Sequence, residues 1–214
     1  MAKKYENQNG KTEMWYVIDA DEDARITYGV RDNITKEELK AAIKDERLEK
    51  LLNVVPSHKG DVFFVEAGTI HAIGKGNLIA EIQQNSNVTY RLYDYGRIGK
   101  DGKPRDLHIE KGLMVSNCRK TIPHKIDVYP DGTRLLGNCD YFAVREINLL
   151  GEKTLYADEK SYHALIVTDG EAKLVFKSKL QRLKTGETVF IPANVGEYSL
   201  CGTATFLLTT NSEK

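Results

Sequence analysis

Three residues whose types could do chemistry together lie within the stretch from Gly60 to Arg97. His71 follows a turn of small residues, while Glu81 and Arg91 each interrupt an apolar run that is typical of a β-strand. We expect the three side chains to lie on neighbouring short strands of one small sheet and to converge on one cavity. An imidazole, a carboxylate and a guanidinium in a cavity could hold a metal ion or move protons, whereas burying them unpaired would be costly.

Structural interpretations of the same residues remain open at this point. A lone histidine in a strand is more often a hydrogen-bonded structural residue than a ligand. Glu81 and Arg91 could form an ion pair that serves only stability. Spacing alone does not separate these structural interpretations from the functional one.

The strands that would position these side chains are predicted from short apolar runs. They occupy residues 14–18, 24–30, 61–65, 78–82 and 88–93. The acidic turn at residues 19–23 lacks the glycine and the distal glutamate of a calcium loop, so we expect it only to join the first two strands as a hairpin. Arg91 falls inside the last of these strands, and His71 falls at the start of a further one.

One long helical pattern interrupts the β segments, at about residues 35–55. Thr35 followed by Glu38 fits a capping box, apolar residues then recur at helical spacing, and Pro56 would end the helix. We expect an insertion packed beside a barrel, with its apolar face in the protein core. A short second helix is predicted at residues 108–117.

After residue 126 the chain is predicted to form short strands separated by glycine turns, a pattern typical of a β-sandwich or jelly roll. The phrase at residues 185–193 parallels the phrase at residues 59–67. No histidine follows the second phrase at the place where His71 follows the first. We therefore expect two related barrels, of which only the first carries chemistry, and a structural role for His163.

The overall composition excludes several classes of protein. Across 214 residues, 31 Lys and Arg balance 31 Asp and Glu, so we expect neither nucleic acid nor a membrane as a partner. No apolar run is long enough to span a membrane, and the first residues lack the apolar core of a secretory signal. Three cysteines without CxxC spacing predict reduced thiols. Together these observations predict a cytoplasmic protein.

Three phrases, taken together and in this order, are highly specific. They are residues 10–16 (GKTEMWY), 67–73 (AGTIHAI) and 79–97 (IAEIQQNSNVTYRLYDYGR). With the rest of the chain they resemble type I mannose-6-phosphate isomerase in its short bacterial form. The resemblance implies a cupin-type, zinc-assisted enzyme that interconverts mannose 6-phosphate and fructose 6-phosphate through an enediol.

Together with the strand pattern, the resemblance implies a domain organisation. Residues 1–120 would form a catalytic cupin-like barrel that lacks its N-terminal part and carries the helix at about residues 35–55. Residues 121–214 would form a second cupin-like barrel of the jelly-roll type. The fold is thus expected to be mainly β, with one helical insertion in the first barrel.

Individual site residues follow from the resemblance by position. Glu13 and His71 match two zinc ligands of the family, and Arg91 matches its catalytic arginine. Glu81 matches an active-site carboxylate, and Lys11 matches a lysine that lines the substrate site. Either Glu81 or Lys11 would carry the proton, and the sequence leaves that choice open. Arg91 would stabilise the negative charge that develops on the enediolate.

One departure from the family pattern bears on activity. The family's other zinc ligands, a Gln-x-His pair, have no counterpart in this chain, which resembles the C-terminal two-thirds of the enzyme. Because a catalytic zinc usually has three protein ligands, we expect this truncated chain to bind zinc weakly and to be nearly inactive. Apolar surface exposed by the missing part could also cause self-association.

The phosphorylated hexose would need cationic groups for its phosphate, and Arg97, Lys100 and Lys103 are candidates. The alternative function is a non-catalytic cupin-like module that binds sugar phosphates or regulates in response to them. A cupin iron oxygenase is a third possibility, but such an enzyme usually needs two histidines and a carboxylate in one cavity.

Overall fold

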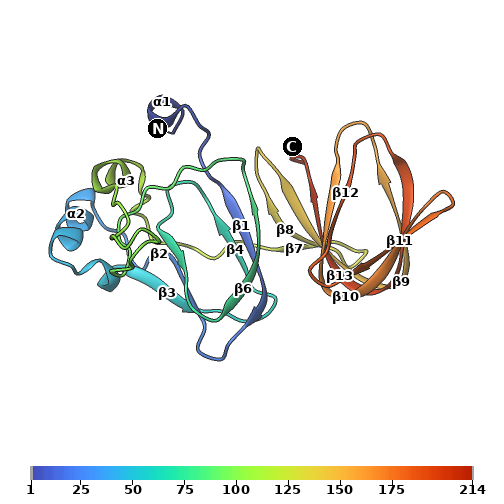
Figure 1. The fold of residues 1–214 in the computed structure, drawn as a ribbon, viewed down its shortest axis with the longest axis horizontal. Helices are drawn as coiled ribbons and strands as arrows, with labels where there is room; N and C mark the ends of the chain where they lie inside the picture. The colour runs from blue at the N-terminus through green and yellow to red at the C-terminus, as the bar shows by residue number, and fades with distance from the viewer. Residues whose placement is uncertain (1, 214) are drawn as a thin grey trace. The chain divides into compact units, whose positions relative to one another are not determined.

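The computed structural model describes residues 2–213, and strands form most of its regular structure (Figure 1). The chain divides into two compact units, residues 1–123 and residues 124–214, which we call unit 1 and unit 2. Unit 1 contains the helical segments α1 (Ala2–Glu6), α2 (Lys36–Lys44), the 3₁₀ helix η1 (Leu48–Lys50) and α3 (Ile109–Val115). Within residues 2–213 we find no helix with the length and apolar character needed to cross a membrane.

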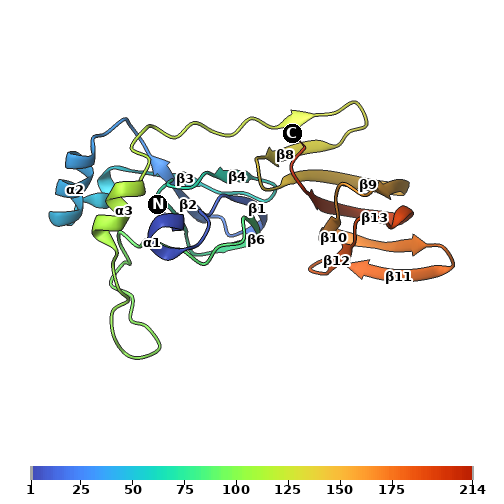
Figure 2. The same ribbon diagram turned by 90° about the horizontal axis from the view of Figure 1, so that it is seen from above.

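Unit 1 contains two antiparallel sheets of three strands each (Figures 1 and 2). The first sheet has the order β4 (Val62–Val65), β1 (Glu13–Ala20), β6 (Asn77–Gln83). The second has the order β3 (Leu52–Pro56), β2 (Arg25–Val30), β5 (His71–Ile73). Side chains from both sheets, among them Trp15, Ile26 and Phe63, form one buried apolar cluster. A core of this unit therefore lies between the two sheets.

The predicted hairpin between the first two strands is wrong. The turn at residues 19–23 does join β1 to β2, but β1 pairs with β4 and β6, whereas β2 pairs with β3 and β5. Both strands are buried along most of their length, so each needs neighbours on both edges and a facing layer to cover it. The two strands therefore meet through side chains such as Trp15 and Tyr28 rather than through the backbone.

The predicted long helix ends about halfway. α2 begins with the predicted capping box, in which the Glu38 N–H donates to Thr35 Oγ1 at 3.1 Å and the Thr35 N–H donates to Glu38 at 2.7 Å. The chain then turns at Glu46 (φ 55°), forms η1 and continues as β3. Leu39 and Leu52 still enter the same buried cluster. The apolar pattern thus identifies core residues correctly, but the second half of the segment forms a turn and η1, and pairing with β2 makes its last residues a strand.

The strand predicted at residues 88–93 does not form, and Arg91 lies in an irregular segment. The backbone of Arg91 forms hydrogen bonds with His108 instead of with a neighbouring strand. The His108 N–H donates to Arg91 O at 2.7 Å, and the Arg91 N–H donates to His108 Nδ1 at 3.2 Å. Leu92 packs into the core with Leu113 of α3, the short helix that was predicted. Anchoring to this helix outweighs the local preference for a strand.

Unit 2 contains a sheet of seven strands, several of them longer than the predicted short ones. They are β7 (Asp127–Val128), β8 (Arg134–Asn138), β9 (Ala143–Ala157), β10 (His163–Phe176), β11 (Lys179–Lys184), β12 (Thr188–Ile191) and β13 (Gly196–Thr210). Gly170 and Gly202 lie inside β10 and β13 with positive φ values, so these glycines bend the strands instead of ending them. Apolar side chains of these strands form one buried cluster within the unit.

The two phrases that are parallel in sequence also share their backbone geometry. Gly60 (φ 89°) donates its N–H to Val17 O at 2.8 Å, and Gly186 (φ 86°) donates its N–H to Val167 O at 2.9 Å. In each case the valine N–H donates in return to the residue after the glycine, at 2.9 Å and 3.0 Å. Positions around this turn can therefore be matched one to one between the units.

Candidate active site

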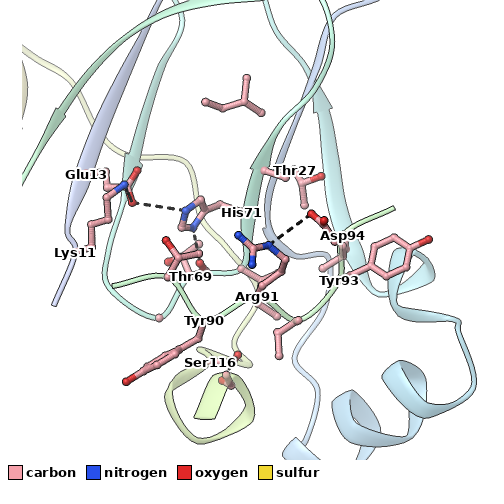
Figure 3. Close-up of a pocket in the computed structure, with 18 of the residues that line it drawn as sticks. Lys11, Glu13, Thr27, Thr69, His71, Tyr90, Arg91, Tyr93, Asp94 and Ser116 are labelled. Carbon is pink, nitrogen blue, oxygen red and sulfur yellow. Dashed lines mark hydrogen bonds and ion pairs between the residues drawn. The ribbon is translucent and has the colours of Figure 1, made fainter. Parts of the chain in front are cut away.

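Unit 1 contains a pocket of about 1370 Å³. The five residues predicted to catalyse the reaction or to bind the metal all line it: Lys11, Glu13, Glu81, His71 and Arg91. Figure 3 shows Glu13 and Arg91 on either side of His71, with Lys11 beside Glu13. The structure thus brings together residues that are up to 80 positions apart in the sequence.

The elements that carry these residues differ from the prediction. Glu13 begins β1 and Glu81 lies on β6, both in the first sheet of unit 1. His71 begins β5 in the second sheet, and Arg91 lies in the irregular segment that follows β6. The expectation that the three predicted residues share one sheet is therefore wrong, because two sheets and a loop each contribute to the pocket.

Glu13 is a buried carboxylate with 1% of its side chain exposed. Its Oε2 accepts a 2.9 Å hydrogen bond from Trp15 Nε1. Its Oε1 has Lys11 Nζ 2.9 Å away as an ion-pair partner and accepts no other hydrogen bond from residues 2–213. Because a buried carboxylate oxygen without a hydrogen bond is costly, this atom is suited to accept a cation or a substrate hydroxyl.

His71 presents one ring nitrogen to this carboxylate. Its Nδ1 lies 2.7 Å from Thr69 O, and since a carbonyl can only accept, Nδ1 carries the proton. Its other nitrogen, Nε2, lies 3.6 Å from Glu13 Oε1 (Figure 3). The edge of the Trp15 indole supports the ring, at 5.2 Å between centroids. A histidine held in this tautomer has its Nε2 lone pair available for a metal ion.

Lys11 connects the two carboxylates of the first sheet. Its Nζ lies 2.9 Å from Glu13 Oε1 and donates to Glu81 Oε1 at 2.8 Å. Burial alone would lower the pKa of Lys11, but the interactions with Glu81 and Glu13 outweigh burial and raise it. The structural ion pair considered between Glu81 and Arg91 is not formed among the described residues, since Lys11 is the partner of Glu81 and Arg91 pairs elsewhere.

Asp94 is a pocket residue that the sequence analysis missed. It is buried, with 7% of its side chain exposed, and Arg91 Nε lies 3.5 Å from its Oδ1. Arg105 donates to both carboxylate oxygens, at 2.7 Å from Nε to Oδ2, and Arg97 Nη2 donates at 3.2 Å. The hydrogen bonds from Arg105, with the other nearby guanidinium groups, lower the pKa of Asp94.

A sequence signal for this cluster does exist. Arg91, Asp94 and Arg97 recur at intervals of three, although Arg105 lies outside that pattern. Of the three residues proposed for phosphate, Arg97 lines the pocket, whereas Lys100 and Lys103 are not among its lining residues. The cationic part of the site is therefore made of arginines that Asp94 gathers, rather than of the lysines in the loop.

Comparison with known proteins decides the family. The family described as "Mannose-6-phosphate isomerase, cupin domain" matches residues 132–211. Mannose-6-phosphate isomerase ManA of Bacillus subtilis is 40% identical over 200 residues, covering 91% of this chain and 62% of that protein. Mannose-6-phosphate isomerase of Streptococcus mutans is 33% identical, covering 99% of this chain and 67% of that protein. A crystal structure of mannose 6-phosphate isomerase from Bacillus subtilis superposes with a TM-score of 0.88 at 33% identity, covering 97% of this chain and 67% of that one.

The chain belongs to the mannose-6-phosphate isomerase family. It spans 62% to 67% of the length of these curated relatives. The cupin-domain match lies within unit 2, whereas the pocket lies in unit 1. Membership of the mannose-6-phosphate isomerase family therefore extends to the pocket through the relatives, which match nearly the whole chain.

The donor atoms of the pocket fit a metal ion in part. Glu13 Oε1 and His71 Nε2 are a carboxylate oxygen and an imidazole nitrogen, both of which zinc accepts at about 2.0–2.2 Å. Their separation of 3.6 Å is compatible with two ligands of one ion. Among residues 2–213, however, no group of three His, Cys, Asp or Glu side chains is placed to hold a metal. The described residues thus bring together two donor atoms that suit a metal ion, and no third.

Proposed function

We propose that the pocket of unit 1 is the site at which mannose 6-phosphate and fructose 6-phosphate are interconverted. The observation that carries this proposal is the buried Glu13 Oε1, which accepts no hydrogen bond from the described residues, pairs with the Lys11 ammonium and faces Nε2 of His71 inside a pocket that also holds Glu81 and Arg91. The names of the relatives support the same conclusion. The reaction moves a proton between the first two carbons of the sugar, so it needs a proton carrier and a group that stabilises an enediolate.

A zinc ion held by Glu13 and His71 would polarise the sugar oxygens as a Lewis acid. The tautomer of His71, fixed by Thr69 O, and the buried position of Glu13 keep both donor atoms directed at the same point. Trp15 contributes to both, because it donates to Glu13 and packs against the His71 ring. These contacts hold the two donor atoms in place before any ligand arrives.

The proton carrier belongs to the Lys11–Glu81 pair. The two side chains share a 2.8 Å hydrogen bond at the pocket wall, and Glu81 is partly exposed to the pocket. Either member of a carboxylate–ammonium pair can exchange a proton with a bound sugar, and the two members can exchange a proton with each other. We assign the proton transfer to this pair. Comparing the turnover of Glu81→Gln with that of Lys11→Met shows which of the two side chains carries the proton.

Arg91 would stabilise the negative charge of the enediolate. Its Nε is held by Asp94 at 3.5 Å and its Nη1 donates to Asp106 O at 3.0 Å. These two contacts fix the plane of the guanidinium, which still has N–H groups to offer to a substrate. A donor fixed in advance is more effective in stabilising developing charge than one that must reorganise.

The measurement that tests this function is isomerase turnover of the metal-free chain as zinc is added. Because the described residues supply only two ligands, we expect weak zinc binding and low turnover that rises with zinc. His71→Asn should lower the zinc-dependent turnover at least about 100-fold, whereas His58→Asn, at an exposed histidine of unit 1, should leave it unchanged. Equal turnover in His71→Asn and the unmodified chain would contradict the proposal.

The same experiment tests the alternative of a non-catalytic module. The observation that favours this alternative is that, among residues 2–213, no group of three His, Cys, Asp or Glu side chains is placed to hold a metal ion. A non-catalytic module would bind mannose 6-phosphate saturably, with or without zinc, and would show no turnover at any zinc concentration. Turnover that depends on His71 excludes it.

A further inference from the structure

Asp94 gathers three arginines at one side of the pocket. Arg105 contacts both of its carboxylate oxygens, and Arg97 and Arg91 contact Oδ1 at 3.2 Å and 3.5 Å. All three arginines line the same pocket as Glu13. One buried carboxylate thus organises three guanidinium groups, which otherwise would repel one another.

The cluster carries more positive charge than Asp94 can neutralise. Three guanidinium groups and one carboxylate leave a surplus of two positive charges at the pocket wall. A phosphate monoester carries a charge of about −1.5 to −2 at neutral pH. The surplus therefore matches the charge of a sugar phosphate.

The arginines also have hydrogen-bond donors to spare. Asp94 uses Nε and Nη2 of Arg105 and only Nη2 of Arg97. Within residues 2–213 no further hydrogen bond from these two side chains is seen, so the remaining N–H groups of each fork are available. The parallel N–H groups of an arginine guanidinium can bind two oxygens of one phosphate at the same time.

The position of the arginine cluster makes the two ends of the pocket chemically different. In Figure 3 the guanidinium of Arg91 lies between His71 and Asp94, so the proposed metal ligands Glu13 and His71 lie on one side of it and Asp94, which binds Arg97 and Arg105, lies on the other. In a hexose 6-phosphate, the reacting carbons and the phosphate likewise lie at opposite ends of the sugar chain. The arrangement of charges in the pocket follows the arrangement of groups in such a substrate.

We propose that Arg97 and Arg105 bind the substrate phosphate and that Asp94 is a positioning residue, which holds these two arginines for the phosphate and Arg91 for the reacting carbons. This inference rests on the proposed function, because it assigns the two ends of the same substrate. It also makes Asp94 the residue that links phosphate recognition to catalysis.

Inorganic phosphate is the first probe, because its binding can be measured without turnover. Arg97→Ala and Arg105→Ala in the full chain should each weaken phosphate binding, measured by calorimetry, about tenfold to 100-fold. The matched control is Arg47→Ala, because Arg47 also pairs with an aspartate and its side chain is 57% exposed, against 61% for Arg97. Arg47 does not line the pocket, so its replacement should leave phosphate binding unchanged.

Asp94→Asn tests the positioning role. It should weaken phosphate binding and also lower kcat with mannose 6-phosphate, whereas Arg97→Ala should raise KM with little change in kcat. If the cluster only stabilised the loop, these variants would change neither the phosphate affinity nor the ratio of KM to kcat. If Asp94→Asn does not fold, which urea denaturation reports, the two arginine variants still decide the phosphate site.

Failure of this inference is distinguishable from failure of the proposed function. Isomerase turnover with unchanged KM in Arg97→Ala and Arg105→Ala would overturn the inference and leave the function standing. Phosphate binding that depends on both arginines, without any turnover, would support the inference and contradict the function. Phosphate binding equal in all variants would overturn the inference.

Discussion

The two units place chemically different pairs at the same position of a shared framework. Across β1 and β4, Glu13 lies opposite Val65; across β10 and β12, His163 lies opposite Ile191. The parallel phrases match Val65 to Ile191, so Glu13 and His163 occupy equivalent places. In unit 1 the strand after the turn brings His71 to Glu13, and in unit 2 it brings Tyr198 to His163.

The surroundings of the two pairs differ as much as the residues do. The Tyr198 hydroxyl and His163 Nδ1 are 2.7 Å apart and satisfy each other, and Tyr198 belongs to the buried apolar cluster of unit 2. Glu13 and His71 are 3.6 Å apart at the wall of a pocket, and Glu13 Oε1 accepts no hydrogen bond from the described residues. One framework therefore supports either a closed core or an open site.

A second pair of matched positions shows the same division. Glu81 lies opposite Trp15 across β1 and β6, whereas Leu208 lies opposite Leu165 across β10 and β13. Leu165 and Leu208 are both buried and contribute to the core of unit 2. Unit 2 uses these positions for apolar packing, which stabilises the fold, while unit 1 uses one of them for a charge. A partly exposed, paired charge such as Glu81 adds less to the core than an apolar side chain, as is expected at a functional site.

The strongest test of this difference between the units is to neutralise one buried carboxylate in each of them. Glu13→Gln should lower zinc affinity at least about 100-fold but change the free energy of unfolding by less than about 1 kcal/mol, because Lys11 loses one carboxylate partner and keeps Glu81. Glu146 of unit 2 is equally buried, but Arg134 donates to both its oxygens, at 3.0 Å and 3.2 Å. Glu146→Gln should lower the free energy of unfolding by about 2 kcal/mol because the partly exposed Arg134 loses its charged partner.

Zinc titration and urea denaturation of the full chain, followed by NMR amide signals of each unit, measure both effects. Glu146→Gln should leave zinc affinity unchanged and so serves as the control for Glu13→Gln. If Glu13→Gln destabilised unit 1 as strongly as Glu146→Gln destabilises unit 2, both carboxylates would be structural. The contrast between an open site and a closed core would then fail.

A smaller effect is expected at the turns that precede the two pairs. Gly68 (φ 96°) and Asn194 (φ 64°) directly follow the two parallel phrases, both with left-handed backbone. An added Cβ at Gly68 would lie 2.5 Å from Val115 O, so Gly68→Ala should cost about 2 kcal/mol of stability. Zinc affinity should also fall about tenfold, because the adjacent Thr69 O orients His71.

Asn194→Ala is the matched variant in unit 2. Asn194 already carries a Cβ while its backbone is left-handed. We therefore expect its replacement to lower the free energy of unfolding by about 1 kcal/mol or less and to leave zinc affinity unchanged. Urea denaturation and zinc titration compare the two variants. Equal zinc affinity in Gly68→Ala and the unmodified chain would show that this turn does not position His71.

The sequence was informative where the signal was local. The runs at residues 61–65 and 78–82 became β4 and β6, and the capping box at Thr35 became the start of α2. The phrases that resemble the mannose-6-phosphate isomerase family identified residues that do line one pocket. These features depend on residues that are close in sequence or on a pattern that a family preserves.

Features that depend on distant partners were not predictable in the same way. The segment at residues 88–93 is held by His108 and α3, which a local strand pattern does not register. Asp94 could be found from its spacing to Arg91, but its role as a centre of three arginines depends on Arg105, eleven positions away. Pairing of β3 with β2 likewise overrode a helical pattern, since hydrogen bonds to a neighbouring strand outweigh local preference.

The smallest effect concerns His163 in its closed surroundings. Burial lowers the pKa of His163, and the nearby Asp158 opposes this only in part. Because the pKa in the folded chain lies below the value of about 6.5 in the unfolded chain, this histidine contributes stability that is fully present above about pH 6.5. That contribution is lost as the pH falls through the folded pKa. His163→Phe should therefore weaken the loss of unit 2 stability between about pH 7.5 and about pH 5, measured by urea denaturation with NMR amide signals of unit 2. The exposed His58→Phe in unit 1 should leave this pH dependence unchanged. An undiminished loss in His163→Phe would mean that burial of this ring is not what separates the closed position in unit 2 from the open one at Glu13.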